Sequence, residues 1–535
     1  MTGMMVHFSI TAGKGSPAVT SGNVLGVGPF ADSASAEALS VLEGWVNECV
    51  ADHEECRWPK FSRGKEEETK PELPTRVIDV GTDADGATVR LVETKGRRDH
   101  YAALSHCWGP PTKQPLCTLK ATFLQHLAGI PVSSLPKTFR DAVAITRLLN
   151  LRYLWIDSLC IIQDDKNDWS MEAPRMGSLY SRAYLVIAAS GARDSSEGCF
   201  VHRIAPNDSI KIPYKADGIQ DGDILLTVRN RYLPEPSLQP LGRRAWVLQE
   251  WVLARRLIHF TSTGLMWSCH RLGKEAMQED GTVVRGNEVN SWDNIIESYT
   301  IRDLTYLSDK LAAVEGISNE MQGSRKDRYF SGVWTGELPQ EVFWIGRETR
   351  RPDELRGFPT WSWASTHGAC LTWTPTRIIG GRLSIHSKCE IEDESTLVVT
   401  GKGRECLIKK WTHLVHDHLR EPPFSEHKTS SISSLPVHFY KTVVHHMLDP
   451  TTGNIIGIAV LDDKDGFSDG EYQCASLFLM REDEHPSRPG EQIVYLALLV
   501  RVSSENPGYY QRIGVGFIVD MEWFQREGAQ KFKIN

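Results

Sequence analysis

Three short apolar runs, separated by helix-like sequence, constrain the fold more than any other feature. They are "YAALS" (101–105), "YLWIDSLCII" (153–162) and "YLVIAAS" (184–190). Between the first two lies "LPKTFRDAVAITRLLN" (135–150), whose apolar residues recur near one face of a helix. Nearly continuous apolar strands that alternate with helices are typical of a parallel sheet covered on both faces. We therefore expect an α/β core in which 153–162 is the central strand.

The rest of the chain predicts helices and strands around this core. We expect strands at 224–230, 256–260 and 265–269 and helices at 36–56, 244–254 and 298–318. The end of the chain is rich in strand-like runs, namely "GIAVLD", "YLALLVRV" and "RIGVGFI", and 425–436 has the composition of a loop. We expect an N-terminal helical segment and linker (1–74), an α/β domain (75–275) and an α+β region (276–535).

Composition restricts the partners and the compartment. A chain of 535 residues is longer than a single hydrophobic core usually supports, so we expect more than one domain. The formal charge of -8 gives no excess of basic residues, so we expect no binding to nucleic acid. We see no leader and no apolar run long enough for a bilayer, so we expect no membrane contact and a cytoplasmic location. The eleven cysteines lack a repeated short spacing, which favours free thiols over a disulfide framework.

One group of residues has the spacing of metal ligands. Cys49, His53 and Cys56 can share one face of the expected N-terminal helix. Two thiols and an imidazole supply three ligands of a structural zinc site, but no fourth ligand is adjacent and the spacing matches no standard finger. We therefore favour a buried helix face, and expect no zinc and no required cofactor.

The polar residues at the strand ends form the candidate site. Ligands of open parallel sheets bind beyond the carboxyl ends of the strands, where neighbouring loops converge. If the strands are neighbours, the polar residues at their ends line one crevice. These residues are then the candidates for binding a small molecule, which would be a nucleotide or a metabolite. They are Ser105, His106, Cys107, Trp108, Gly109, Asp157, Cys160, Gln163, Trp169 and Glu250.

Several residues in this crevice suggest chemistry. His106 with Asp157 or Cys160 forms an acid–base or nucleophilic set, although a turn-capping aspartate and an inert buried thiol explain the last two as well. Glu250 either enters the site or pairs with Arg243, Arg244 or Arg255. We expect Glu172 in the first turn of a helix that starts near 167–170. There its carboxylate either complements the helix dipole or stabilises positive charge on a ribose. Pro174 fits neither account.

Four segments together resemble the fungal heterokaryon-incompatibility (HET) domain, over roughly residues 75 to 270. They are "YAALSHCWG", "LPKTFRDAVAITRLLNLRYLWIDSLCIIQDDKNDW", "YSRAYLVIAASGARDSSEGCF" and "RRAWVLQEWVLARRLIHF". The resemblance implies a fungal intracellular protein of programmed cell death, with a flavodoxin-like core related to the Toll/interleukin receptor (TIR) fold. Some TIR relatives cleave NAD, and "DWSME" is similar to the segment that carries their catalytic glutamate. The resemblance thus implies an NAD+ glycohydrolase with Glu172 as the catalytic carboxylate. His106 and Asp157 are catalytic candidates from their residue types, and under this reading they shape the pocket.

Two other functions remain open. The domain could act on a different small molecule of fungal secondary metabolism through His106, Asp157 or Cys160. Alternatively, it is a non-catalytic assembly module whose C-terminal region recognises a protein partner or a second copy of the chain.

Overall fold

The computed structural model divides the chain into two compact units. Unit 1 contains Met1–Glu288 and Ala312–Ser324, and unit 2 contains Val289–Leu311 and Arg325–Asn535. The domain limits expected from the sequence stay predictions. The structure describes residues 7–12, 16–24, 30, 32–61, 70–81, 86–201, 209–215, 222–229, 236–273, 275–279, 283–285, 291–372, 383–414, 443–463, 471–482, 495–518, 522–525 and 527–535. The loop expected at 425–436 lies outside these residues.

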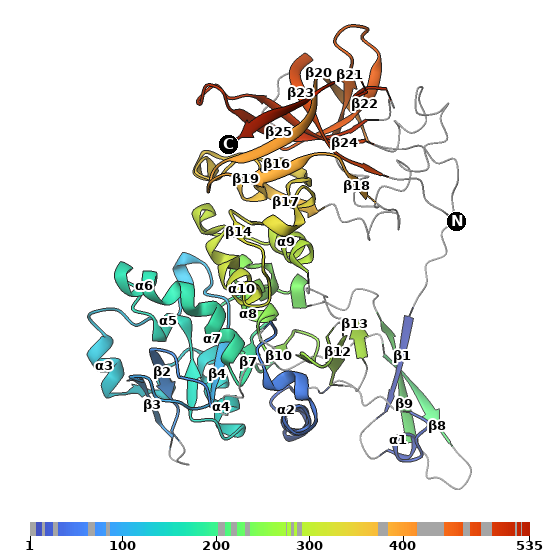
Figure 1. Ribbon diagram of the computed structural model, residues 1–535. Coiled ribbons are helices and arrows are strands. Elements are labelled where there is room, and N and C mark those ends of the chain that lie inside the picture. Colours follow the sequence, from blue (N-terminus) through green and yellow to red (C-terminus); the bar gives the residue numbers. More distant parts are fainter. Residues whose placement is uncertain are drawn as a thin grey trace. The chain divides into compact units, whose positions relative to one another are not determined.

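Unit 1 combines helices with a large mixed sheet (Figure 1). Its helices are α1 (Pro17–Thr20), α2 (Ala36–Asp52), α3 (Phe123–Ala128), α4 (Lys137–Leu148), α5 (Asp157–Cys160), α6 (Lys166–Glu172), α7 (Met176–Arg182), α8 (Ala245–Val252) and α10 (Ala312–Gln322). Its strands are β1 (His7–Ala12), β2 (Arg76–Asp79), β3 (Thr88–Glu93), β4 (Tyr101–Ser105), β5 (Ile130–Pro131), β6 (Tyr153–Trp155), β7 (Leu185–Ala188), β8 (Ser209–Tyr214), β9 (Gly222–Arg229), β10 (Arg256–Phe260), β11 (Leu265–Cys269), β12 (Glu275–Gln278) and β13 (Val283–Arg285).

The centre of the ten-stranded sheet is parallel and its flanks are antiparallel. The strand order is β13-β12-β11-β10-β7-β4-β6-β2-β3-β5, and the block β10-β7-β4-β6 is parallel. Burial explains this block: every residue of these four strands is buried, as the continuous apolar runs predicted. The mixed α/β class is thus confirmed, but the sheet is not parallel throughout. β1, β8 and β9 form a separate three-stranded sheet.

Helices cover both faces of the parallel block. Because crossovers between parallel strands are right-handed, the return from β4 to β6 and the return from β6 to β7 place their helices on opposite faces. Figure 1 shows α4 and α2 below these strands and α7, α8 and α10 above them. The helices α7, α8 and α10 also pack on one another. Below the sheet, Trp45 of α2 stacks on Trp267 of β11, with ring centroids 6.3 Å apart.

The run 153–162 differs from its expected form. Only β6, Tyr153–Trp155, is a strand, and the helical turn α5 begins two residues later at Asp157. β6 also lies at the edge of the parallel block, beside the antiparallel β2, so it is not the central strand. Apolarity predicted burial correctly here, but a short apolar run does not distinguish a strand from a buried helical turn.

Unit 2 is rich in strands, as expected, and it contains one α-helix among its described residues. Its elements are α9 (Trp292–Thr300), β14 (Tyr329–Phe330), β15 (Val333–Trp334), β16 (Trp344–Arg350), β17 (His367–Thr372), β18 (Leu383–Ile385), β19 (Lys388–Ile391), β20 (Leu397–Leu414), β21 (Val443–Leu448), β22 (Ile455–Leu461), β23 (Glu471–Glu482), β24 (Tyr495–Val502), β25 (Tyr510–Ile518) and β26 (Ala529–Ile534). The single helix expected at 298–318 is wrong, because α9 ends at Thr300 and α10 starts at Ala312.

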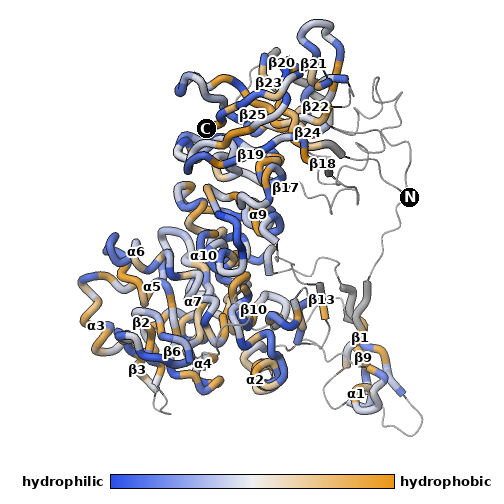
Figure 2. Tube along the Cα trace, in the orientation of Figure 1, coloured by the Kyte–Doolittle hydropathy of each residue, from blue (hydrophilic) through white to orange (hydrophobic). Residues whose placement is uncertain are grey.

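The large sheet of unit 2 closes on itself. β23, β24, β25, β22, β21 and β20 pair in that order, all antiparallel, and β20 pairs back onto β23. Figure 2 shows β24 as a hydrophobic run, in contrast to the hydrophilic α6 of unit 1. Within the described part of the chain, no helix has the length and apolarity required to cross a bilayer.

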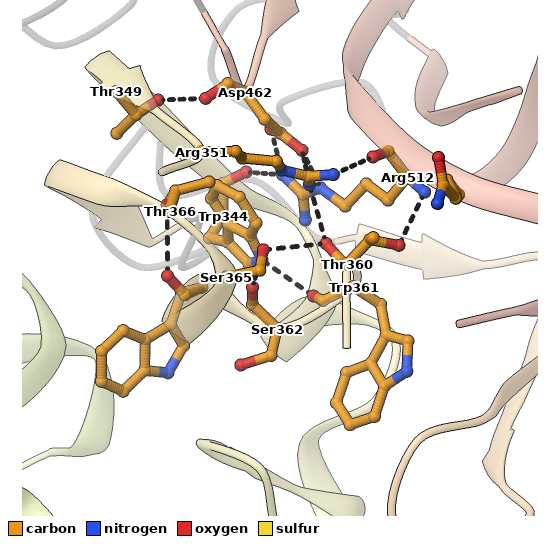
Figure 3. Close-up of polar contacts among 12 residues, drawn as sticks. Trp344, Thr349, Arg351, Thr360, Trp361, Ser362, Ser365, Thr366, Asp462 and Arg512 are labelled. Atoms are coloured by element: carbon orange, nitrogen blue, oxygen red, sulfur yellow. Dashed lines mark hydrogen bonds and ion pairs between the residues drawn. The ribbon is translucent and has the colours of Figure 1, made fainter. Parts of the chain in front are cut away.

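A buried ion-pair network ties the closed sheet to β16 (Figure 3). Arg512 of β25 donates from Nε to Asp462 Oδ2 at 2.9 Å and from Nη2 to Asp462 Oδ1 at 3.0 Å. Its guanidinium also donates to the carbonyls of Val342 and Trp344. Arg351 donates to the same carboxylate at 3.0 Å. The buried charges are therefore paired, which is the condition for burying them.

Candidate functional site

A histidine, an aspartate and a tryptophan meet at the carboxyl ends of β4 and β6. His106 Nε2 lies 2.9 Å from Asp157 Oδ1, and Trp108 Nε1 donates to Asp157 Oδ2 at 2.7 Å. The His106 side chain is only 1% exposed, whereas that of Asp157 is 21% exposed. Asp157 is therefore the member of the pair that faces solvent.

The sheet register brings these residues together. Ala103 of β4 is the partner of Trp155 of β6, so the residues that follow both strands emerge at the same edge. The turn α5 then holds Asp157, whose Oδ1 accepts from the backbone N–H of Ser158 at 2.7 Å. Gln163 donates from Nε2 to the Asp157 carbonyl at 3.1 Å, which supports this turn from the following loop. The parallel pairing thus confirms that the polar ends of these strands share one edge.

Charge complementarity keeps Asp157 ionised. Burial alone would raise the pKa of its carboxyl, but the charge and hydrogen bond of His106 outweigh burial and lower it, with help from Trp108 and Arg244. Both ring nitrogens of His106 face acceptors, because Nδ1 lies 3.2 Å from the Cys107 carbonyl. Arg244 fixes the backbone by donating from Nη1 to the His106 carbonyl.

Glu250 of α8 supplies a second carboxyl with the opposite behaviour. Burial raises its pKa to about 7, against the lowering effects of the Ser105 hydroxyl and of Arg244, and the charge of Asp157 adds to the rise. Its Oε2 is buried and has no hydrogen-bond partner among the described residues, and the same holds for Ser105 Oγ. The serine is thus near this carboxyl without a hydrogen bond of good geometry. Two unpaired buried polar groups at a strand end are typical of a binding or catalytic site.

The predicted cysteines are poor nucleophiles. Burial raises the pKa of Cys107 to about 11 and that of Cys160 to about 12, so both remain thiols near neutral pH. Gly109 has φ +83, and an added Cβ there would lie 2.7 Å from the Asp194 Cβ, which explains the need for glycine. These residues line the strand ends but give no reason to assign them chemistry.

Glu172 belongs to a different element, α6, from the residues of the His106 and Asp157 pair. It is the last residue of α6, so the expected place in a first helical turn is wrong, and Pro174 belongs to the 3-10 turn that follows. Its carboxyl is buried and faces Arg175, with Oε1 3.8 Å from Nη1. Among the described residues, no hydrogen bond connects it with His106 or Asp157. Trp169 is 44% exposed on the same helix.

Two neighbours of the site were not predicted as such. Tyr180 of α7 donates to the Leu104 carbonyl at 3.3 Å, and its pKa is raised first by burial and then by the charges of Glu250 and Asp157. Arg244 was expected only as one of the arginines able to pair with Glu250. The sequence pattern does not mark Tyr180 or Arg244 as site residues, because a tyrosine or an arginine near a helix usually faces the core or the solvent.

The zinc candidates gain a fourth member. His53 is the C-cap of α2, Cys56 lies in the following 3-10 turn, and the two approach Cys49 and the end of β11. There Cys269 places its Sγ 3.4 Å from His53 Nδ1. A search for adjacent ligands could not find this residue, because Cys269 follows His53 by 216 residues.

These features define an α/β domain with an acid–base cluster at the ends of its parallel strands. Residues 101–250 match the family model described as heterokaryon incompatibility protein (HET). Residues 101–250 of the chain therefore carry a HET domain, as the resemblance predicted. Neither the curated proteins nor the solved structures searched gave a match. The relation to the TIR fold stays a prediction.

Proposed function

We propose that the HET domain is a hydrolase that cleaves the nicotinamide–ribose bond of NAD+. The observation that carries the proposal is the pair of carboxyls with opposite pKa shifts, Asp157 and Glu250, beside the unpaired Ser105 hydroxyl. Carboxyls whose environments separate their pKa values are the usual acid–base equipment of glycoside hydrolysis. The family resemblance supplies the substrate class.

The residues suggest a division of roles. When the C1′–N bond breaks, its electron pair goes to the pyridinium nitrogen and nicotinamide leaves as a neutral molecule. Positive charge then develops on the ribose, and a nearby carboxylate stabilises it. Glu250, with a pKa of about 7, is suited to accept the proton of the attacking water. Asp157 and Trp108 would position the ribose, with His106 fixing the aspartate.

Glu172 remains the alternative catalytic carboxylate, since the family resemblance points to it. It is buried with only a loose contact to Arg175, and its charge acts on the Cys160 thiol at the end of α5. In either case, depletion of NAD+ would link the domain to the cell death expected of its family.

Nicotinamide release by the purified full-length protein tests the proposal. Wild type should release nicotinamide from NAD+, and Glu250→Gln should slow release by about 100-fold or more, the usual contribution of a general base. Glu93→Gln, which changes an exposed glutamate of β3, should leave the rate unchanged. No release from folded wild type contradicts the proposal. Loss of release in Glu172→Gln but not in Glu250→Gln moves the catalytic role to Glu172.

A second candidate is acid–base chemistry on another small metabolite. The observation that favours it is the His106–Asp157 pair, which serves proton transfer to many substrates. Mass spectrometry of small molecules that co-purify with wild type, but not with Asp157→Asn, distinguishes the two. A retained nucleotide supports NAD+ cleavage, whereas a different retained metabolite supports the second candidate.

A further inference from the structure

Three thiols and one imidazole converge below the sheet of unit 1, away from the strand-end site. The ligand atoms of Cys49, His53, Cys56 and Cys269 all lie within 4.8 Å of one another. A tetrahedral zinc site with bonds of about 2.3 Å to sulfur and 2.0–2.1 Å to nitrogen separates sulfur from nitrogen by about 3.6 Å and two sulfurs by about 3.8 Å. The observed separation between Cys269 Sγ and His53 Nδ1 is 3.4 Å. The cluster is therefore close to the dimensions of such a site.

Different elements converge to build this cluster. Cys49 lies in the last turn of α2, His53 caps that helix, and Cys56 lies in the 3-10 turn Glu54–Arg57. Cys269 ends β11, which belongs to the large sheet. All three cysteines are buried, so the group is held by the core and not by a surface loop.

Backbone donors point at two of the sulfurs. The backbone N–H of Arg271 is directed at the thiol of Cys56, and the backbone N–H of Leu272 is directed at the thiol of Cys269. Donors aimed at sulfur stabilise thiolates, which are the form that binds metal. The turn after Cys269 makes this possible, because Gly273 adopts φ +56 and donates to the Cys269 carbonyl at 3.3 Å.

We propose that Cys49, His53, Cys56 and Cys269 bind one structural zinc ion that fastens α2 to the end of β11 in the ten-stranded sheet. Four protein ligands leave no open position, which is the character of a structural site and not of a catalytic one. Three soft thiolates and one imidazole select zinc over magnesium or calcium.

The charges around the cluster fit a bound ion. Zn²⁺ with three thiolates and a neutral imidazole carries a net charge of -1. Arg256 donates to the Cys56 carbonyl at 3.2 Å, and its charge acts on Cys49. Arg255 donates to the Arg57 carbonyl at 3.0 Å, one residue beyond Cys56. Cations beside an anionic site reduce the cost of burying it.

Metal analysis of the full-length protein tests this site. Protein purified without chelator should contain about one zinc ion per chain, as a four-ligand site requires. Cys269→Ser should lower the affinity for zinc by at least about 10–100-fold, which is what loss of a residue that only orients a ligand already costs, so the purified variant should carry less zinc. Cys117→Ser, which changes a half-exposed cysteine outside the cluster, should keep the wild-type content.

A second pair of variants separates loss of a ligand from loss of the fold. His53→Ala should lose zinc, whereas His53→Cys should retain it, because a fourth thiolate completes an all-cysteine site. Co²⁺ added to the chelator-treated wild type should give the absorption of tetrahedral thiolate coordination, which Cys269→Ser should weaken. Zinc-free protein with all thiols free overturns the proposal. So does a Cys49–Cys56 disulfide, or equal zinc content in wild type and Cys269→Ser.

Discussion

His106 and Asp157 lie 51 positions apart in the sequence, yet Nε2 of the imidazole is 2.9 Å from Oδ1 of the carboxylate. The pair exists because β4 and β6 are parallel neighbours whose following residues emerge at one edge of the sheet. A buried imidazole that faces acceptors on both sides, with a partly exposed carboxylate, is suited to hold a ligand or move a proton.

The first prediction concerns the stability cost of Glu250. Its pKa rises from 4.5 to about 7 on folding, so the native state holds more protons than the unfolded state between those values. Stability contributed by Glu250 should therefore fall as pH rises from about 4.5 to 7. Glu250→Gln should be more stable than wild type by up to about 3 kcal/mol at pH 8 and equal to it near pH 4.5.

Denaturant titrations of both proteins at the two pH values measure this difference. Glu93→Gln serves as the control for removal of an exposed charge. A Glu250→Gln variant that is less stable than wild type at pH 8 would show that the carboxylate is satisfied in the folded protein.

The second prediction concerns the contact of α7 with α10. A Cβ added to Gly316 would lie 2.5 Å from Gln249 Oε1 and 2.6 Å from Gly177 Cα, so the two helices touch through their glycines. Gly316→Ala should lower the free energy of unfolding by about 1–3 kcal/mol through overpacking. Gly44→Ala in α2, where nothing lies within 4 Å, should instead raise it by about 0.5–1 kcal/mol. Equal responses to both changes in thermal unfolding would contradict the packing account.

The third prediction concerns the buried ion pair of unit 2. Removing one partner of a buried pair leaves an uncompensated charge and costs about 3–5 kcal/mol. Asp462→Asn should therefore lower the unfolding midpoint strongly, since Arg512 and Arg351 both lose their carboxylate. The matched control is Asp353→Asn, which breaks a pair with Arg356 that is exposed on both sides and should have little effect. A comparable small loss in both variants would refute the importance of the network.

The fourth prediction concerns Lys310, which is buried in unit 2. Burial lowers its pKa from 10.5 to about 8, although it donates to the carbonyls of Trp363 and Thr366. The unfolded state then binds more protons between pH 8 and 10.5, so the contribution of this lysine to stability rises with pH across that window. Relative to wild type, Lys310→Met should be most favourable below pH 8, and its advantage should fade by pH 10.5. Lys326→Met, at an exposed position, should show no such trend in denaturant titrations.

Periodicity predicted an amphipathic helix, and continuous apolarity predicted strands that are buried on both faces. The helix expected at 135–150 is α4, and the strands expected at 101–105 and 184–190 are β4 and β7. The secondary structure of each of these segments follows from its own sequence, either from the helical spacing of its apolar residues or from an uninterrupted apolar run. The same signal could not divide 298–318 into two helices, because its apolar residues fit one helix equally well.

The sites depended on contacts that sequence does not encode locally. Ser105, His106 and Trp108 were found because they follow a predicted strand directly. The raised pKa of Glu250 and the orphaned Ser105 hydroxyl depend on how α8 packs against the sheet, and Cys269 joins Cys49 only through the fold. Residues that approach across long separations leave no periodic trace in the sequence.

The most direct measurement is the pH dependence of nicotinamide release by wild type and Glu250→Gln. If Glu250 accepts the proton of the attacking water, kcat/KM of wild type should rise with pH through about 7 and level off above it, since only the carboxylate is active. The residual rate of Glu250→Gln should lack this rise. Wild type with a flat profile across pH 7, or a variant that keeps both the rate and the profile, would contradict the account.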